Sequence, residues 1–189
     1  MTQLHAIDWS TLPPPEDDGG ARHLPGLRLP SLPLPATDGS TVDLARLPGR
    51  TIVYAYPLTG RPDRALPEGW DQIPGARGCT PQSCAFRDHD AELKRLGAAH
   101  LFGLSTQGTD YQREAAERLH LPFLLLSDAG LALATALDLP RFEVDGATLL
   151  RRLTMVLRDG LVEHVLYPVF PPDRSAADVA AWLAAHPAG

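Results

Sequence analysis

Apolar runs and amphipathic segments alternate along most of this chain. Residues 51–57, TIVYAYP, are β-branched and aromatic without a charge, which is typical of a strand buried on both faces. Similar runs alternate with segments whose apolar residues recur at helical spacing. In chain order, these are a helix from Thr80 to Leu96, a strand at 100–106, a helix at 109–121, a strand at 122–128 and a helix at 130–139. This alternation predicts parallel strands joined by helices.

The C-terminal part of the chain departs from this alternation. Residues 149–157 and 161–169 flank an Asp-Gly turn signal, so we expect an antiparallel hairpin there. A helical segment follows at 175–186, with Ser175 as its expected N-cap. The order strand, helix, strand, helix, strand, helix, hairpin, helix predicts an α/β domain with a thioredoxin-like fold, in which helices flank a mixed central β-sheet.

Two segments lie outside this pattern. Residues 1–22 are polar and rich in proline, so we expect an extended or poorly ordered lead-in to a single domain over 23–189. Residues 58–78 contain several Gly and Pro without periodicity. Long loops inside a compact domain tend to be functional, and this one leads directly to a cysteine. Its Trp70 could belong to the core, to a lid or to a partner contact.

Composition excludes several classes of function. The 17 basic and 23 acidic residues give a net charge of −6 at pH 7, and no basic run occurs, which argues against binding to nucleic acid. No apolar run reaches the length of a membrane span, and the N-terminus lacks the pattern of a signal peptide. We therefore expect a cytoplasmic protein without a membrane partner. There, a close cysteine pair is more often catalytic, redox-sensing or metal-binding than structural.

The two cysteines of the chain, Cys79 and Cys84, lie in the segment GCTPQSC. Thr80 can serve as an N-cap and Pro81 suits the first helical position, which places Cys79 where backbone N–H groups and the helix dipole favour a thiolate. The alternative is a buried, inert cysteine.

The spacing of the two cysteines restricts how they can react with each other. Residues five apart in a continuous helix have Cα atoms about 8–9 Å apart, whereas a disulfide needs about 4.4–6.8 Å. A Cys79–Cys84 bond therefore requires the first turns of the helix to unwind. On spacing alone, Cys84 could equally be a small core residue.

Metal or cofactor chemistry has little support in the sequence. His89 follows the two cysteines, but there is no second cysteine pair and no tight histidine cluster. The glycine motifs that bind phosphates or dinucleotides do not occur either. We expect no metal and no cofactor, and metal carriage is only a third hypothesis.

The segment GCTPQSCAFRDHDAEL resembles the active-site helix of the bacterioferritin-comigratory (Q-type) peroxiredoxins. The matching residues are Gly78, Cys79, Thr80, Cys84, Phe86, Arg87 and Asp88, and the similarity continues through FGLSTQ, PFLLLSD and RLTMVLRDGLVEHV, over roughly residues 25–170. The resemblance implies a thiol-dependent peroxidase. Cys79 would attack a hydroperoxide and become a sulfenic acid, with which Cys84 condenses to an intramolecular disulfide. A thioredoxin-like dithiol would then reduce that disulfide.

The resemblance also implies a role for Arg152. This residue matches the family arginine that stabilises the thiolate and the charge developing on the peroxide. Periodicity alone does not distinguish it from Arg151, since neighbours on a strand point to opposite faces and both could be solvated. Further residues expected at the substrate pocket are Tyr56, Pro57, Gly78 and Thr80.

One residue of the family pattern is missing. Members usually carry a threonine three residues before the first cysteine, where it hydrogen-bonds the substrate, and Ala76 occupies that position here. Either Thr59 or another donor replaces it, or the interaction is lost. Our leading hypothesis is an atypical two-cysteine peroxidase, monomeric or weakly dimeric. The alternative is a thioredoxin-fold peroxide or redox sensor, or a partner-binding protein, with little turnover.

Overall fold

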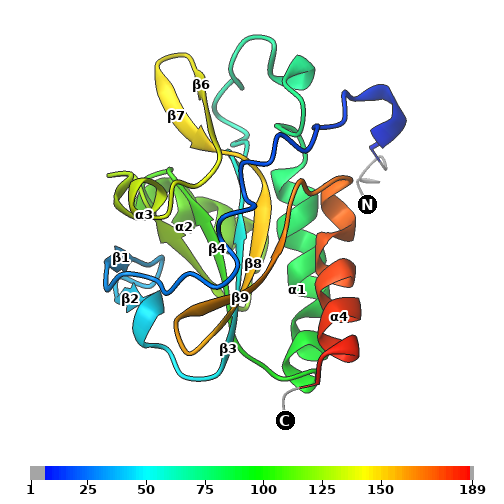
Figure 1. Cartoon of the computed structure of the whole chain (residues 1–189). Coiled ribbons are helices and arrows are strands. Elements are labelled where there is room, and N and C mark those ends of the chain that lie inside the picture. The colour runs from blue at the N-terminus through cyan, green and yellow to red at the C-terminus, as the bar shows by residue number, and fades with distance from the viewer. Residues whose placement is uncertain (1–6, 188–189) are drawn as a thin grey trace.

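A five-stranded mixed sheet forms the centre of the protein in a computed structural model, which describes residues 7–187 (Figure 1). The strand order is β5-β4-β3-β8-β9. The strands are β3 (Arg50–Ala55), β4 (Ala98–Ser105), β5 (Leu124–Ser127), β8 (Leu153–Arg158) and β9 (Leu161–Leu166). β3, β4 and β5 pair in parallel, whereas β8 is antiparallel to both β3 and β9. This arrangement confirms the predicted mixed sheet.

Helices cover both faces of this sheet. Those of residues 7–187 are α1 (Cys79–Arg95), α2 (Thr109–Arg118), α3 (Ala132–Ala136) and α4 (Ser175–Ala185). α1, α2 and α4 pack on the face of β3 that carries Ile52 and Tyr54. The opposite face of β3, which carries Val53 and Ala55, is covered by α3 and residues 21–47. All six residues of β3 are buried, as the uncharged run predicts.

Two small hairpins and four short 3₁₀ helices complete the described elements. The hairpins pair β1 (Pro33–Pro35) with β2 (Thr41–Asp43), and β6 (Arg141–Val144) with β7 (Ala147–Leu150). The 3₁₀ helices are η1 (Trp9–Thr11), η2 (Leu44–Arg46), η3 (Trp70–Gln72) and η4 (Pro172–Arg174). The β6–β7 hairpin was not predicted, although its Asp145-Gly146 turn is a hairpin signal.

The start of α1 differs from the prediction. Gly78, not Thr80, is the N-cap, so Cys79 is the first helical residue and Pro81 the third. Gly78 has a φ of 108°, a left-handed conformation that only glycine adopts without a Cβ clash. Pro81 is tolerated because N–H groups of the first turn have no acceptor within the helix.

The prediction of Ser175 as an N-cap was also wrong. η4 leads directly into α4, so Ser175 already has the helical angles φ −52° and ψ −45°. Its hydroxyl is buried and accepts a hydrogen bond from the Gln82 side chain at 3.3 Å. The hydroxyl therefore joins two helices instead of capping one.

Arg151 and Arg152 lie between strands, not on one strand as predicted. β7 ends at Leu150 and β8 begins at Leu153, because the chain passes there from the small hairpin into the central sheet. The two arginines still point in different directions. Arg151 Nε lies 3.8 Å from a carboxylate oxygen of Asp18, whereas Arg152 is only 4% exposed.

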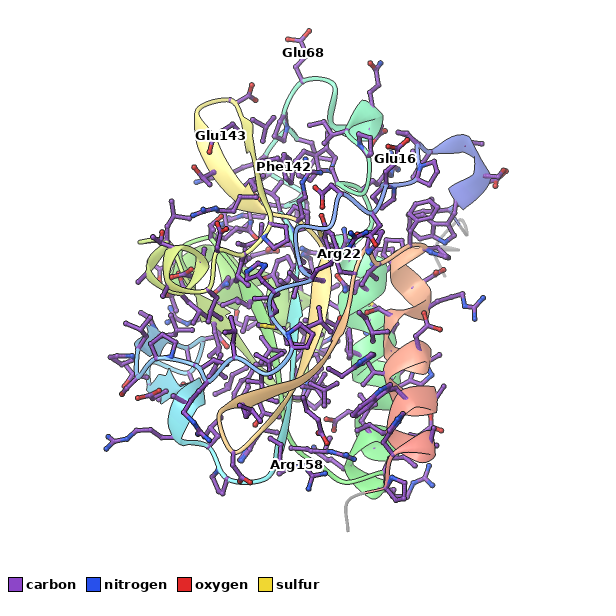
Figure 2. The ribbon with its side chains drawn as sticks, in the orientation of Figure 1. Glu16, Arg22, Glu68, Phe142, Glu143 and Arg158 are labelled. Carbon is purple, nitrogen blue, oxygen red and sulfur yellow. The ribbon has the colours of Figure 1, made fainter. Side chains whose placement is uncertain are left out.

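Two segments cover the N-terminal end of α1. The first is the N-terminal arm, residues 7–18, which belongs to the predicted lead-in. Residues 1–6 of that lead-in lie outside the described part. Apart from η1, the arm forms neither helix nor strand. In Figure 1 it runs from the start of α4 past the 58–78 loop. That loop lies beside the β6–β7 hairpin, which carries Phe142 (Figure 2). Trp70 contacts Phe142 with ring centroids 6.3 Å apart and is buried, so it belongs to a small core.

Candidate active site

Cys79 borders a cavity of about 230 Å³ at the N-terminal end of α1. Its side chain is only 3% exposed. The remaining lining residues are Ile7 of the N-terminal arm, Leu58, Gly60, Leu66, Trp70 and Arg77 of the 58–78 loop, and Gly78, Thr80 and Pro81 at the helix start. The predicted pocket residues Gly78 and Thr80 therefore lie beside Cys79. A larger hollow of about 350 Å³, lined in part by Gln107 and Tyr111, includes neither Cys79 nor Arg152.

Arg152 reaches Cys79 from the connection between β7 and β8. Its Nη2 lies 3.3 Å from Cys79 Sγ and also donates to the carbonyls of Ala76 at 3.2 Å and Arg77 at 3.3 Å. Within residues 7–187, no carboxylate lies within ion-pair distance of this guanidinium. The buried guanidinium thus places its positive charge beside the sulfur, where it can stabilise negative charge.

Gln82 holds the other side of the guanidinium and was missed by the sequence analysis. Its Oε1 accepts a hydrogen bond from Arg152 Nη1, and its Nε2 donates to Ser175 Oγ at 3.3 Å. Ser175 Oγ in turn lies 3.2 Å from Thr154 Oγ1. The one available signal was spacing, because Gln82 follows Cys79 by three residues and so shares its helix face. These contacts set the orientation of Arg152 toward the sulfur.

Cys84 lies on the same continuous helix, half-buried and not bonded to Cys79. Between the two cysteines, the buried Ser83 accepts a hydrogen bond from the Tyr54 hydroxyl at 3.0 Å. The Tyr54 ring stacks on Phe86 with centroids 4.3 Å apart. Burial raises the pKa of Tyr54 well above its ordinary value, so this hydroxyl stays protonated and donates. Unwinding of the first turns would break this contact together with those of Gln82.

The remaining predicted pocket residues do not line the cavity. Tyr56 and Pro57 are buried and do not line it, although Tyr56 belongs to the same core cluster as Cys79. Thr59 does not replace the missing threonine, since its hydroxyl bonds Gln107 Oε1 at 3.1 Å and it does not border the cavity. Ala76 contributes its carbonyl, which accepts hydrogen bonds from Arg152 Nη2 at 3.2 Å and from Cys79 Sγ at 3.7 Å.

Metal ligands do not gather in the part of the chain that the structure describes. Over residues 7–187, no three His, Cys, Asp or Glu side chains are arranged to hold a metal ion. His89 instead places its Nδ1 2.8 Å from the Ala85 carbonyl. Over the same residues, no helix has the length and apolar character needed to cross a bilayer.

Most of the chain matches a known protein family. The redoxin family model matches residues 24–182, which include both cysteines and Arg152. The chain belongs to the redoxin family. The match begins after the N-terminal arm, so the arm lies outside the part of this redoxin that the family model covers.

Relatives of this redoxin are Q-type peroxiredoxins, which confirms the resemblance found in GCTPQSC. The chloroplastic peroxiredoxin Q of Sedum lineare is 33% identical over 147 residues, covering 77% of this chain and 69% of the relative. That of Oryza sativa subsp. japonica is 33% identical over 151 residues, covering 79% and 61%. This redoxin thus spans about three-fifths of the length of several curated relatives.

The solved structures confirm the thioredoxin-like peroxiredoxin fold. The crystal structure of peroxidoxin BcpB from Mycobacterium tuberculosis is similar with a TM-score of 0.70 and 26% sequence identity. The match covers 87% of this redoxin and 98% of that chain.

Proposed function

We propose that this redoxin is a thiol-dependent peroxidase that reduces hydrogen peroxide or organic hydroperoxides. The observation that carries the proposal is the 3.3 Å contact between Arg152 Nη2 and Cys79 Sγ beside a cavity. The guanidinium favours the nucleophilic thiolate, and it can also stabilise the negative charge that develops on the peroxide oxygens. It therefore supports both the nucleophile and the transition state.

The first proposed step oxidises Cys79. Its thiolate attacks one peroxide oxygen, so that an S–O bond forms while the O–O bond breaks. The other oxygen takes up a proton and leaves as water or an alcohol. The sulfur becomes a sulfenic acid, and the peroxide is reduced by the same two electrons.

The second proposed step assigns Cys84 as the resolving cysteine. Its sulfur attacks the sulfenic sulfur of Cys79, an S–S bond forms, and the sulfenic oxygen leaves as water. A thioredoxin-like dithiol then reduces the disulfide by exchange and is itself oxidised. Support comes from the half-buried, unbonded state of Cys84 on the same helix. The helix must open between Cys79 and Cys84 in each cycle, because the Cα separation across five helical residues is too large for a disulfide.

Ala76 is the feature that favours the sensor alternative, because its side chain cannot donate a hydrogen bond to a substrate. The retained Arg152 contact and the second cysteine favour a catalytic cycle instead. Steady-state turnover distinguishes the two hypotheses. Robust multiple turnover with a thioredoxin system excludes a protein that only senses peroxide.

The experiment follows thiols and peroxide together. One equivalent of hydrogen peroxide should remove both thiols of the reduced protein, and a thioredoxin system should sustain turnover. Cys79→Ser should abolish peroxide consumption. Cys84→Ser should still consume one equivalent but stop at a Cys79 sulfenic acid that a dimedone-type probe captures. Peroxide consumption by Cys79→Ser at the wild-type rate would contradict the proposal.

Two further properties stay predictions from the sequence. Sedimentation velocity measures the monomeric or weakly dimeric state, and fractionation of source cells tests the cytoplasmic location.

A further inference from the structure

The N-terminal arm packs at a defined position on the domain. Trp9 is half-buried, and its Nε1 donates a hydrogen bond of 2.8 Å to an Asp173 carboxylate oxygen in η4. Its ring meets Phe170 edge-on with centroids 6.1 Å apart. Asp8 caps the short turn that presents Trp9, since its side chain accepts from the Ser10 amide. The position of Trp9 is therefore fixed from two sides.

Trp9 lies directly over the backbone that precedes Cys79. A Cβ built on Gly78 would lie 2.9 Å from Trp9 Cη2 and 2.6 Å from Pro172 Cγ, so both rings contact the bare Gly78 backbone. Pro15 of the same arm contacts Gly75 in a similar way, at 3.2 Å from its ideal Cβ position. The arm thus covers the chain on both sides of the carbonyls that Arg152 binds.

The contact between Trp9 and Gly78 requires the start of α1 to be folded, because Gly78 is the N-cap of this helix. The proposed peroxidase cycle needs this helix start in two states: folded when Cys79 meets peroxide beside Arg152, and unwound when Cys84 reaches Cys79. Unwinding moves the Gly78 backbone and thereby breaks its packing against Trp9. A contact that is present in only one of two states shifts the equilibrium toward that state by the full free energy of the contact.

We propose that Trp9 is a positioning residue that holds the start of α1 in the peroxide-reactive conformation and thereby slows resolution by Cys84. The inference rests on the proposed peroxidase cycle. Loss of the Trp9 contacts favours the unwound state. Disulfide formation therefore accelerates, by about three- to tenfold if the loss equals one hydrogen bond. The peroxide-dependent step slows or stays constant, and less Cys79 is overoxidised to sulfinic acid per turnover, because its sulfenic acid persists for a shorter time.

The test separates the two steps by rapid quenching. Reduced protein is mixed with hydrogen peroxide, quenched at intervals, and its thiol, sulfenic and disulfide forms are counted by mass spectrometry, which needs no tryptophan signal. Trp9→Ala and Asp173→Ala should both accelerate the peroxide-independent step. Trp9→Phe keeps a ring over Gly78 but lacks the N–H donor, so it should fall between wild type and Trp9→Ala. The matched control is Glu16→Ala, an exposed position on the same arm (Figure 2), which should match wild type.

Three outcomes would overturn the inference. Equal resolution rates in wild type, Trp9→Ala and Asp173→Ala would show that the arm does not hold the helix start, and the peroxidase proposal would stand. An equal acceleration in Glu16→Ala would assign the effect to the arm in general and not to Trp9. If wild type oxidises Cys79 but never forms the disulfide, the resolving role of Cys84 fails first, and the inference fails with it.

Discussion

Replacement of Arg152 tests the central contact of the proposed mechanism. Nη2 lies 3.3 Å from Cys79 Sγ, and the guanidinium has no carboxylate within ion-pair distance among the described residues. Arg152→Met keeps an unbranched side chain but removes the charge and all five N–H donors. Arg152→Lys keeps the charge as a single ammonium, which cannot bind the sulfur, the carbonyls and the glutamine at once.

The magnitude follows from one charge-assisted hydrogen bond. Such a bond contributes about 1.5–3 kcal/mol, and each 1.4 kcal/mol of barrier changes a rate about tenfold. The second-order rate constant of Cys79 with peroxide should therefore fall roughly 10- to 150-fold in Arg152→Met. Arg152→Lys should fall less, because the positive charge remains.

The assay isolates the first step in a Cys84→Ser background. Without the second cysteine, Cys79 stops at the sulfenic acid, and trapping after rapid quenching gives its rate of formation against peroxide concentration. Arg151→Met is the matched control, because this neighbouring arginine faces Asp18 and does not line the cavity. Circular dichroism confirms that each variant is folded at the assay temperature. A rate for Arg152→Met within twofold of the background, or an equal loss in Arg151→Met, would refute the reasoning.

Three further perturbations test the surroundings. Gly78→Ala places a Cβ 2.6 Å from a proline ring at a φ of +108°. The free energy of unfolding, measured by urea titration, should therefore fall by about 1–3 kcal/mol. The control Gly130→Ala, whose Cβ would have nothing within 4 Å, should leave the titration unchanged. Gln82→Leu removes a guanidinium acceptor and should slow sulfenic acid formation about tenfold in the trapping assay. Two hydrogen bonds lower the pKa of Asp18, the larger effect coming from a backbone amide and the smaller from a tyrosine hydroxyl. Its carboxylate therefore stabilises the docked arm at neutral pH, and this effect is lost as pH falls through the lowered folded-state pKa. Tryptophan fluorescence should show an acid transition that Asp18→Asn lacks, and identical profiles would contradict this.

Local patterns were sufficient for the central elements of the fold. The buried run at 51–57, the helical spacing after Thr80 and the Asp-Gly turn before Leu161 each predicted an element that the structure contains. Such patterns succeed because the period of apolar residues reflects which face of a strand or helix is buried. The two cysteines could be identified as candidates for a similar reason, since both lie on one short segment.

Contacts between distant segments decided the rest. The true start of α1 depends on a glycine that packs against Pro172 and Trp9, and no local pattern near residue 78 contains that information. Arg152 meets Gln82 across 70 residues, so its contact with Cys79 could be inferred only through family resemblance, and Gln82 itself was missed. Secondary structure follows from neighbours in the chain, whereas this site is assembled by packing of a helix start, a strand connection and the N-terminal arm. Only the tertiary structure could bring these three segments together around one sulfur.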